Sequence, residues 1–182
     1  PHHPDFTRDG KEPMVKVAGA TAAAPTFYKP LQEGGYTFID GGVWANNPTM
    51  IGLTDALSCY DVPREQVKIL SIGCGDDPYI VTRRQIAYGG AWYWKNIILA
   101  AMHLQSLNAV GQAGLLIGAD RLIRVVPSLD RKIEMDDWMA AKKYLPSEAE
   151  RVMELIGDEV SSMFLQQRAE PFTPIVPNSS PL

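Results

Sequence analysis

Residues 36–48 have the sequence Tyr-Thr-Phe-Ile-Asp-Gly-Gly-Val-Trp-Ala-Asn-Asn-Pro, and they decide how the rest of the chain is interpreted. Tyr36 to Phe38 follow the paired glycines 34 and 35 in a β-rich run, a pattern that predicts a short buried strand. Gly41 and Gly42 then allow a sharp exit turn. This places Asp40 at the carboxyl end of the strand, where open α/β sheets bind their ligands. Asp40 is therefore our main candidate for chemistry.

The end of the same stretch predicts the start of a helix. Either Asn46 or Asn47 can cap it, and Pro48 suits its first turn. Apolar residues recur with helical spacing after Pro48, namely Met50, Leu53 and Leu57. We therefore expect a helix from Pro48 to Tyr60 that covers the sheet beside Asp40.

Other segments extend the alternation of strands and helices. We expect a short strand followed by small residues within Val15–Ala24, a parallel strand buried on both faces at Val67–Ile72, and a last strand at Leu122–Val126. A helix is predicted from Lys95 to about Leu116, with one side formed by Ala100, Leu104, Leu107 and Val110. Strands that alternate with helices favour an α/β protein.

Two helix starts are predicted near the end of the chain. Asp136 and Asp137 are placed to cap a helix or to interact with its dipole. Ser147 and Glu150 form a capping box after Pro146, which predicts a separate amphipathic helix. Three prolines end that helix: Pro171, Pro174 and Pro177.

Composition narrows the function classes. The 182 residues are 46% hydrophobic and 21% charged, as is ordinary for a globular protein, and they fit one domain. A net charge of -4 without a large basic cluster argues against nucleic-acid binding. Two cysteines, Cys59 and Cys74, are too few for a disulfide scaffold or a zinc site, so we expect a reducing compartment. Residues 1–13 carry no apolar stretch of the kind found in signal peptides.

Alternative candidate sites carry weaker signals. His2 and His3 have no third metal ligand nearby, and Asp76 and Asp77 beside Pro78 are typical of solvated or capping carboxylates. Cys74 has no adjacent general base. The aromatic stretch Tyr88–Trp94 suits either a membrane interface or internal packing. We predict no metal and no cofactor.

The motifs resemble those of patatin-like phospholipases. Residues 38–49 are similar to the family's Asp-Gly-Gly motif followed by Asn-Asn-Pro. Ala20–Phe27 resembles its small-residue segment, with Ala22 where many members have Ser, and Ile69–Gly75 resembles its Gly-Thr-Gly strand, with Cys74 in place of Thr. Arg121–Asp137 is similar to the family's last strand and the acidic helix entry that follows. The four matches occur in the family's order and span roughly residues 17 to 165.

Two family motifs are absent from the sequence. Patatin-like enzymes attack acyl esters with the serine of a Gly-X-Ser-X-Gly turn, and an upstream glycine-rich loop forms the oxyanion hole. Neither motif occurs in these 182 residues, and Ser71-Ile72-Gly73-Cys74-Gly75 lacks the preceding Gly-X. We therefore expect the chain to be the C-terminal half of a catalytic domain, with the upstream half as its partner.

The resemblance implies a fold and a function. The fold would be the C-terminal part of a three-layer patatin-like sandwich with a mostly parallel central sheet. The function would be hydrolysis of acyl esters in phospholipids by a Ser-Asp dyad, in which Asp40, with its motif glycines Gly41 and Gly42, accepts the serine's proton. We expect residues 1–14 to be a loop or the start of a fragment, 15–170 to be the patatin-like part, and 171–182 to be a tail or linker.

Two other classes stay open. The chain could belong to a catalytically inactive patatin-like module that binds lipid or protein. It could also belong to a bacterial phospholipase effector that a cyclic dinucleotide activates; the Gly-X-Gly at residues 73–75 is too weak to decide for nucleotide binding. For all three we expect a cytoplasmic protein with at most peripheral membrane contact, because Ile97–Met102, the longest apolar run in its helix, is far shorter than the ~20 residues that span a bilayer.

Overall fold

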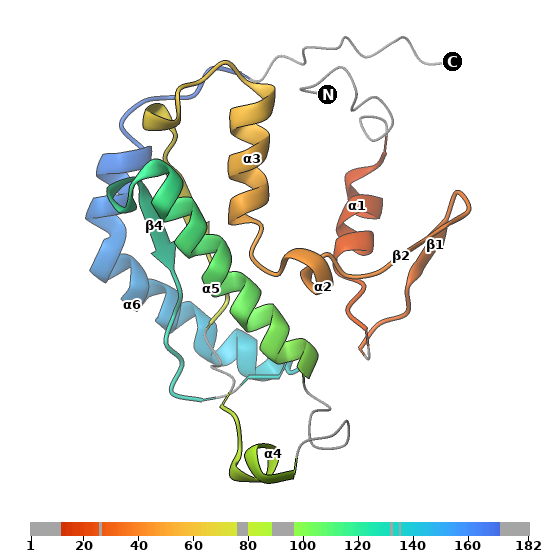
Figure 1. The fold of residues 1–182 in the computed structure, drawn as a ribbon. Coiled ribbons are helices and arrows are strands. Elements are labelled where there is room, and N and C mark those ends of the chain that lie inside the picture. Colours follow the sequence, from red (N-terminus) through yellow and green to blue (C-terminus); the bar gives the residue numbers. More distant parts are fainter. Residues whose placement is uncertain are drawn as a thin grey trace.

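The computed structural model describes residues 12–25, 27–75, 80–88, 97–131, 133–134 and 136–171. Helices and strands alternate along much of this part of the chain (Figure 1). The elements in order are α1 (Met14–Thr21), β1 (Leu31–Glu33), β2 (Tyr36–Phe38), α2 (Gly42–Ala45), α3 (Thr49–Cys59), the 3-10 helix η2 (Arg64–Gln66), β3 (Ile69–Ile72), α4 (Arg83–Tyr88), α5 (Ile97–Ile117), the 3-10 helix η3 (Ala119–Arg121), β4 (Leu122–Val125) and α6 (Trp138–Phe164). The protein is therefore of the mixed α/β class.

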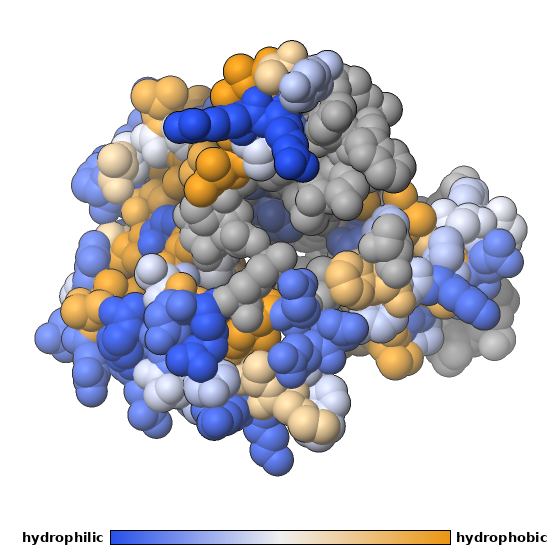
Figure 2. Space-filling view, turned by 90° about the horizontal axis from the view of Figure 1, so that it is seen from below, coloured by the Kyte–Doolittle hydropathy of each residue, from blue (hydrophilic) through white to orange (hydrophobic). Residues whose placement is uncertain are grey.

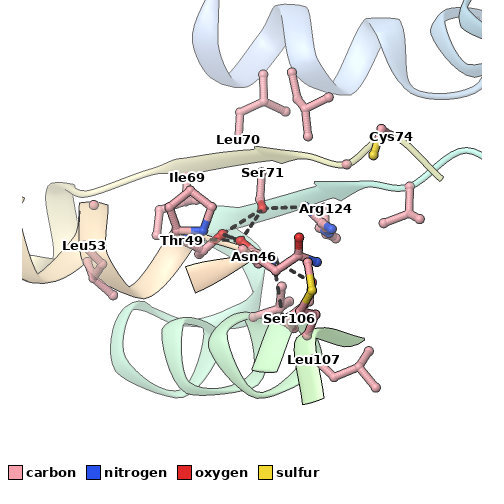
Figure 3. Close-up of a pocket in the computed structure, with 18 of the residues that line it drawn as sticks. Asn46, Thr49, Leu53, Ile69, Leu70, Ser71, Cys74, Ser106, Leu107 and Arg124 are labelled. Atoms are coloured by element: carbon pink, nitrogen blue, oxygen red, sulfur yellow. Dashed lines mark hydrogen bonds between the residues drawn. The ribbon is translucent and has the colours of Figure 1, made fainter. Parts of the chain in front are cut away.

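Strands β3 and β4 form a parallel pair, as the sequence predicts. Ile69 lies opposite Leu122, and Ser71 lies opposite Arg124. Helix α5 lies below the pair and α6 above it in the view of Figure 3. The expected burial of both faces of β3 is wrong: Ile72 is 71% exposed, and only Ser71 of this strand is buried. Within the described residues no second strand pairs with β3, so one of its edges is uncovered.

The strand before Asp40 exists, but its environment differs from the prediction. Strand β2 pairs antiparallel with β1, and all three of its residues are exposed. The loop between them consists of Gly34 and Gly35, which both have positive φ values, 58° and 81°. Two such residues form the mirror-image turn whose twist suits a tight hairpin. Asp40 therefore follows an exposed hairpin instead of a strand of the parallel sheet.

The first element is also different from the prediction. Residues 14–21 form helix α1, where we expected a strand to begin at Val15. Valines at alternate positions suggested a strand, but Ala18 and Ala20 belong to the residue type that favours a helix most. Lys16 lies 2.6 Å from Glu12 and 3.1 Å from Glu33, so an ion pair connects α1 to the hairpin.

The small hydrophobic core lies where α3 and α5 meet the parallel pair. Leu53, Ala113 and Ile117 are fully buried there, and Met50 and Leu57 pack against them as predicted. Helix α5 has the predicted extent to within two residues. Leu104 and Leu107 are 63% and 57% exposed, whereas the buried positions are Ala100, Ala109, Ala113 and Ile117. Small alanines allow α5 to approach its neighbours closely.

Helix α6 is one continuous element of 27 residues. The predicted cap at its start is confirmed, since Asp137 Oδ1 accepts a hydrogen bond of 3.0 Å from Ala140 N. The predicted second helix start is wrong: Pro146 lies inside the helix, and the Ser147 hydroxyl donates back to Tyr144 O. A helix can accommodate a proline, at a cost, when its other turns are intact.

Many large apolar side chains of the described residues remain exposed. Hydrophobic patches lie between charged side chains on the face shown in Figure 2. Among the described helices, none combines the length and apolar character needed to cross a membrane.

Candidate active site

Asp40 lies in a loop that is fixed to the end of α1. Its backbone N–H donates to Ala23 O at 3.0 Å, and the N–H of Gly41 donates to Thr21 O at 3.3 Å. Ala23 is 4% exposed and belongs to the alanine-rich segment that follows the helix. The two sequence motifs before α3 therefore meet in space, and their contact positions a half-buried carboxylate.

The carboxylate of Asp40 is anchored through one oxygen. Oδ1 accepts a hydrogen bond of 2.5 Å from the N–H of Gly42. In the described part of the chain, no partner is recorded for Oδ2 of Asp40. This one hydrogen bond sets the orientation of the side chain.

The two positions after Asp40 require glycine because neighbouring atoms leave no room for a Cβ, and not because of an unusual backbone angle. Neither is among the glycines with positive φ. A Cβ on Gly41 would lie 2.9 Å from Thr21 Oγ1, and a Cβ on Gly42 would lie 2.8 Å from Asp40 Oδ1. Both separations are shorter than ordinary van der Waals contact. The pair thus lets the backbone approach α1 and the carboxylate closely.

A short helix that the sequence did not predict connects this loop to α3. Helix α2 has four residues, and its turn closes through hydrogen bonds from Trp44 N and Ala45 N to Gly41 O. It packs against α5, and the side chain of Met102 lies near Gly42. The position of Asp40 therefore depends on α5 as well as on α1.

Asn47 joins α2, α3 and α5 through its amide and its backbone. It is 3% exposed. Its Oδ1 accepts from Thr49 N at 3.1 Å and from Thr49 Oγ1 at 2.5 Å, and its Nδ2 donates to Ser106 Oγ at 3.2 Å. Its own N–H donates to Gln105 Oε1 at 3.1 Å. We expected Asn46 or Asn47 as the cap of α3, but its N-cap residue is Pro48; Asn47 precedes it, accepts from the first N–H of the helix and also binds α5.

Two polar residues of the parallel pair continue this network. The hydroxyls of Ser71 and Thr49 are 2.7 Å apart, and Arg124 Nη1 donates to Ser71 Oγ at 2.9 Å (Figure 3). The sequence analysis missed both Ser71 and Arg124. Their signal was present: each is a polar residue inside an apolar strand, and parallel register places them opposite one another.

A groove of about 1000 Å³ lies beside this network. Every residue from 67 to 75 lines it, which indicates that it follows the length of β3. Its other walls come from α3 and α5 and include Leu53, Met102 and Leu107. Asp40 does not line the groove, which begins at Asn46.

The other candidates do not form a site in the described residues. Cys74 is exposed, with a free thiol, and lines the groove. Cys59 is half-buried and donates to Asp55 Oδ1 at 3.5 Å; desolvation and then Asp55 raise the pKa of its thiol. His2, His3, Asp76, Asp77 and the tryptophans of 88–94 lie outside the described residues. No cluster of three His, Cys, Asp or Glu side chains occurs within the described ranges.

Comparisons with known proteins support the resemblance seen in the sequence. The model of the family described as patatin-like phospholipase matches residues 2–53, which include Asp40. No solved structure matches the chain. Over residues 2–53 the chain is similar to the patatin-like phospholipase family.

The matched curated relatives are cGAMP-activated phospholipases. The protein from Escherichia coli (strain TW11681) is 38% identical over 115 residues, which cover 56% of this chain and 32% of the relative. The protein from Vibrio cholerae is 36% identical over the same length and shares of each chain. A third, from Pseudomonas aeruginosa, is 37% identical over 75 residues, or 40% of this chain and 22% of the relative. The match therefore spans about a third of the length of the first two relatives.

Proposed function

We propose that this chain supplies the base of a lipid acyl hydrolase of the phospholipase A type. In the proposed dyad, a serine outside the 182 residues attacks the ester carbonyl and Asp40 accepts its proton. The proton then passes to the leaving alcohol, which departs as the acyl-enzyme forms, and water hydrolyses that intermediate. The substrate is an acyl ester such as a phospholipid. No metal or cofactor takes part in this scheme.

One observation carries the proposal. Asp40 is held through Oδ1 by the Gly42 N–H, while no partner is recorded for Oδ2 among the described residues. A base needs both a fixed orientation and an accessible lone pair within reach of the proton that it removes. The similarity to the patatin-like family supports the reaction class.

Two substitutions of Asp40 separate a catalytic role from a structural one. They are made in the chain joined to the upstream half that carries the serine. Asp40→Asn keeps an oxygen that accepts from Gly42 N but cannot accept the proton, so kcat should fall about 100-fold to 10,000-fold with KM and the melting temperature little changed. Asp40→Ala removes both functions and should also lower the melting temperature.

Two results would contradict the proposed role. Near wild-type kcat in Asp40→Asn would exclude Asp40 as the base. A loss that follows only the folded fraction would make Asp40 a structural residue. Asp136→Asn is the control, because Asp136 lies at the exposed start of α6.

The upstream half of the domain is the proposed partner of the groove along β3. The edge of β3 that no described strand covers and the exposed side chain of Ile72 both favour a missing neighbour. An uncovered strand edge pairs readily with another chain. The relatives are about three times as long as the matched part, which leaves ample sequence for the covering strands and for the complete three-layer sandwich.

Size-exclusion chromatography of the 182 residues alone, and with the separately expressed upstream half, tests this arrangement. We expect the isolated chain to self-associate and to form a 1:1 complex with the upstream half. It should also fail to hydrolyse a p-nitrophenyl ester until that half is added, because it lacks nucleophile and oxyanion hole. A monodisperse monomer with a cooperative melt would contradict the proposal.

Activation by a cyclic dinucleotide is the second candidate, and the names of the relatives favour it. Hydrolysis by the complete protein should then require cGAMP and should not respond to the same concentration of AMP. Activity that is independent of cGAMP would leave the hydrolase proposal intact and remove the regulatory one. A complete protein without the serine motif would instead be an inactive lipid- or protein-binding module. We further propose a cytoplasmic protein that contacts membranes only peripherally, with residues 15–170 as the folded part.

A further inference from the structure

We propose that Arg124 is a positioning residue for the Asp40 loop and that it acts through a one-way chain of hydrogen bonds. This inference rests on the proposed function for its kinetic consequence, although its structural consequence can be measured without any activity. The series of hydrogen bonds runs from Arg124 in β4 through Ser71 to Thr49 (Figure 3). From Thr49 it continues to Asn47.

The direction of the hydrogen bonds in this series is fixed at its Asn47 end. Oδ1 of Asn47 faces the N–H of Thr49 at 3.1 Å, and a backbone N–H can only donate. This assigns the amide oxygen to that position. The Thr49 hydroxyl lies 2.5 Å from the same oxygen, which can only accept. The hydroxyl must therefore donate its single proton to Asn47 Oδ1. Thr49 Oγ1 then has only its lone pairs left for Ser71.

The direction is also fixed at the Arg124 end. A guanidinium has no acceptor, so the 2.9 Å contact between Arg124 Nη1 and Ser71 Oγ must be a donation to the hydroxyl. The Ser71 proton consequently points away from Arg124 and toward Thr49 Oγ1, 2.7 Å away, with Asn47 Oδ1 as a longer second acceptor at 3.5 Å. Distances alone leave that pair ambiguous, but its two neighbours require Ser71 to donate. All the hydroxyl protons thus point from the cation toward Asn47.

Burial makes this order energetically important. Asn47, Thr49 and Ser71 are 3%, 8% and 6% exposed, so water cannot replace a lost partner easily. A buried polar network strengthens its bonds when every member is satisfied and is costly when one is not. Without Arg124, the Ser71 hydroxyl can rotate, and its donation toward Thr49 is no longer enforced.

The far end of the network reaches the Asp40 loop through α2. Asn47 follows Asn46, the C-cap residue of α2, and a Cβ on Gly42 would lie 3.3 Å from the Asn46 side chain. On its other side Asn47 binds Ser106 and Gln105 of α5, against which α2 packs. A change in the amide of Asn47 therefore shifts the helix that begins at Gly42, whose N–H holds the Asp40 carboxylate. The hydrogen bonds that connect Arg124 to the Asp40 loop run through Ser71, Thr49 and Asn47, so its effect is indirect.

Hydrogen exchange of the complete protein tests the structural part. In Arg124→Met the amides of Gly42 and Thr49 should exchange about tenfold faster. The amide of Gly73, which bonds to Val125 O across the parallel pair, should keep its wild-type rate. Thr49→Val, which removes only the hydroxyl, should reproduce the change at Gly42, and Thr49→Ser should restore it. Faster exchange at Gly73 with an unchanged Gly42 would overturn the inference, and so would equal rates throughout.

A double-mutant cycle tests the kinetic part. Arg124→Met and Thr49→Val should each lower kcat about 10-fold to 100-fold at constant KM, and the double variant should lose no more than the worse single one. Additive losses would mean that Arg124 acts by another route and would overturn the inference. If the wild-type protein has no hydrolase activity, the proposed function fails, and the exchange experiment alone decides on the positioning role. Should Arg124→Met not fold, Thr49→Val and Thr49→Ser give the same comparison.

Discussion

The Gly42 N–H holds the Asp40 carboxylate at 2.5 Å, and the position of a Cβ on Gly42 would lie 2.8 Å from the same oxygen. Asp40 and Gly42 therefore depend on one another: the glycine provides both the hydrogen bond and the space for it. An Asp-Gly-Gly motif in this chain is thus a single geometric unit rather than an acid followed by a flexible turn.

Substitution of Gly42 by alanine should consequently displace the carboxylate. The added methyl group cannot occupy its position unless Asp40 Oδ1 moves, so we expect kcat of the complete protein to fall by about 100-fold, the loss typical of a misplaced catalytic group. The backbone angle at Gly42 does not forbid alanine, which means that the fold should survive. Kinetics and circular dichroism of the same preparation measure both effects.

Gly111→Ala is the matched control for that substitution. Gly111 is an exposed helical position of α5 with nothing within 4 Å of an added Cβ. There alanine should raise stability by about 0.5–1 kcal/mol and leave kcat unchanged. Similar activity losses in both variants would show that the contact between Gly42 and Asp40 is unimportant.

Asn47 should be far more important for stability than its neighbour Asn46. Asn47→Ala leaves the Thr49 N–H, the Thr49 hydroxyl and the Ser106 contact without their partner, and each unsatisfied buried group costs about 1–3 kcal/mol. Asn46 is exposed, so Asn46→Ala should change the free energy of unfolding by less than about 0.5 kcal/mol. Urea denaturation of the two variants measures the difference. Equal effects would mean that the network around Asn47 is not satisfied in solution.

The sequence predicted those elements whose local and tertiary signals agree. Helix α3, strands β3 and β4, helix α5 and the Asp137 cap were all found within a few residues of their real bounds. The repeated Met50, Leu53 and Leu57 mark a helix by period alone, and the same three residues form part of the core.

The predictions of burial fail for segments that few other elements of the described structure cover. Tyr36 and Phe38 look like a buried strand by composition, yet within the described residues only β1 pairs with them, so they remain 63% and 36% exposed. Leu104 and Leu107, which the sequence places on one side of α5, are likewise exposed. A periodic pattern shows that a face is apolar but not what covers it.

The network residues were missed for a different reason. Ser71 and Arg124 are far apart in sequence, and their contact depends on the register of two parallel strands. Local patterns do not contain that register. A polar residue within each of two apolar strands would have been the usable signal, because buried polar groups need partners.

The two cysteine thiols should differ in reactivity. Cys74 is exposed, whereas Cys59 is half-buried, and desolvation followed by the hydrogen bond to Asp55 raises the pKa of its thiol. A raised pKa keeps a thiol protonated to higher pH, and the thiolate is the reactive form. Iodoacetamide at pH 8 should therefore label Cys74 first, as measured by peptide mass spectrometry. The rates should converge in urea; faster labelling of Cys59 in the folded protein would contradict its environment.

Helix α6 continues through Pro146, and two substitutions can distinguish this single helix from a pair of helices that meet at the proline. A proline inside a helix lacks the N–H for one backbone bond and costs about 3 kcal/mol relative to alanine. Because Pro146 is exposed, alanine there meets no steric obstacle, and Pro146→Ala should stabilise the protein by up to about 3 kcal/mol.

The Ser147 hydroxyl donates to Tyr144 O within the helix and does not cap a new one, so Ser147→Ala should change stability by less than about 0.5 kcal/mol. If α6 instead consisted of two helices that meet at Pro146, Ser147 would be an N-cap and its loss would cost about 1 kcal/mol, while Pro146→Ala would have little effect. Denaturant melts of both variants, with wild type as reference, distinguish the two arrangements.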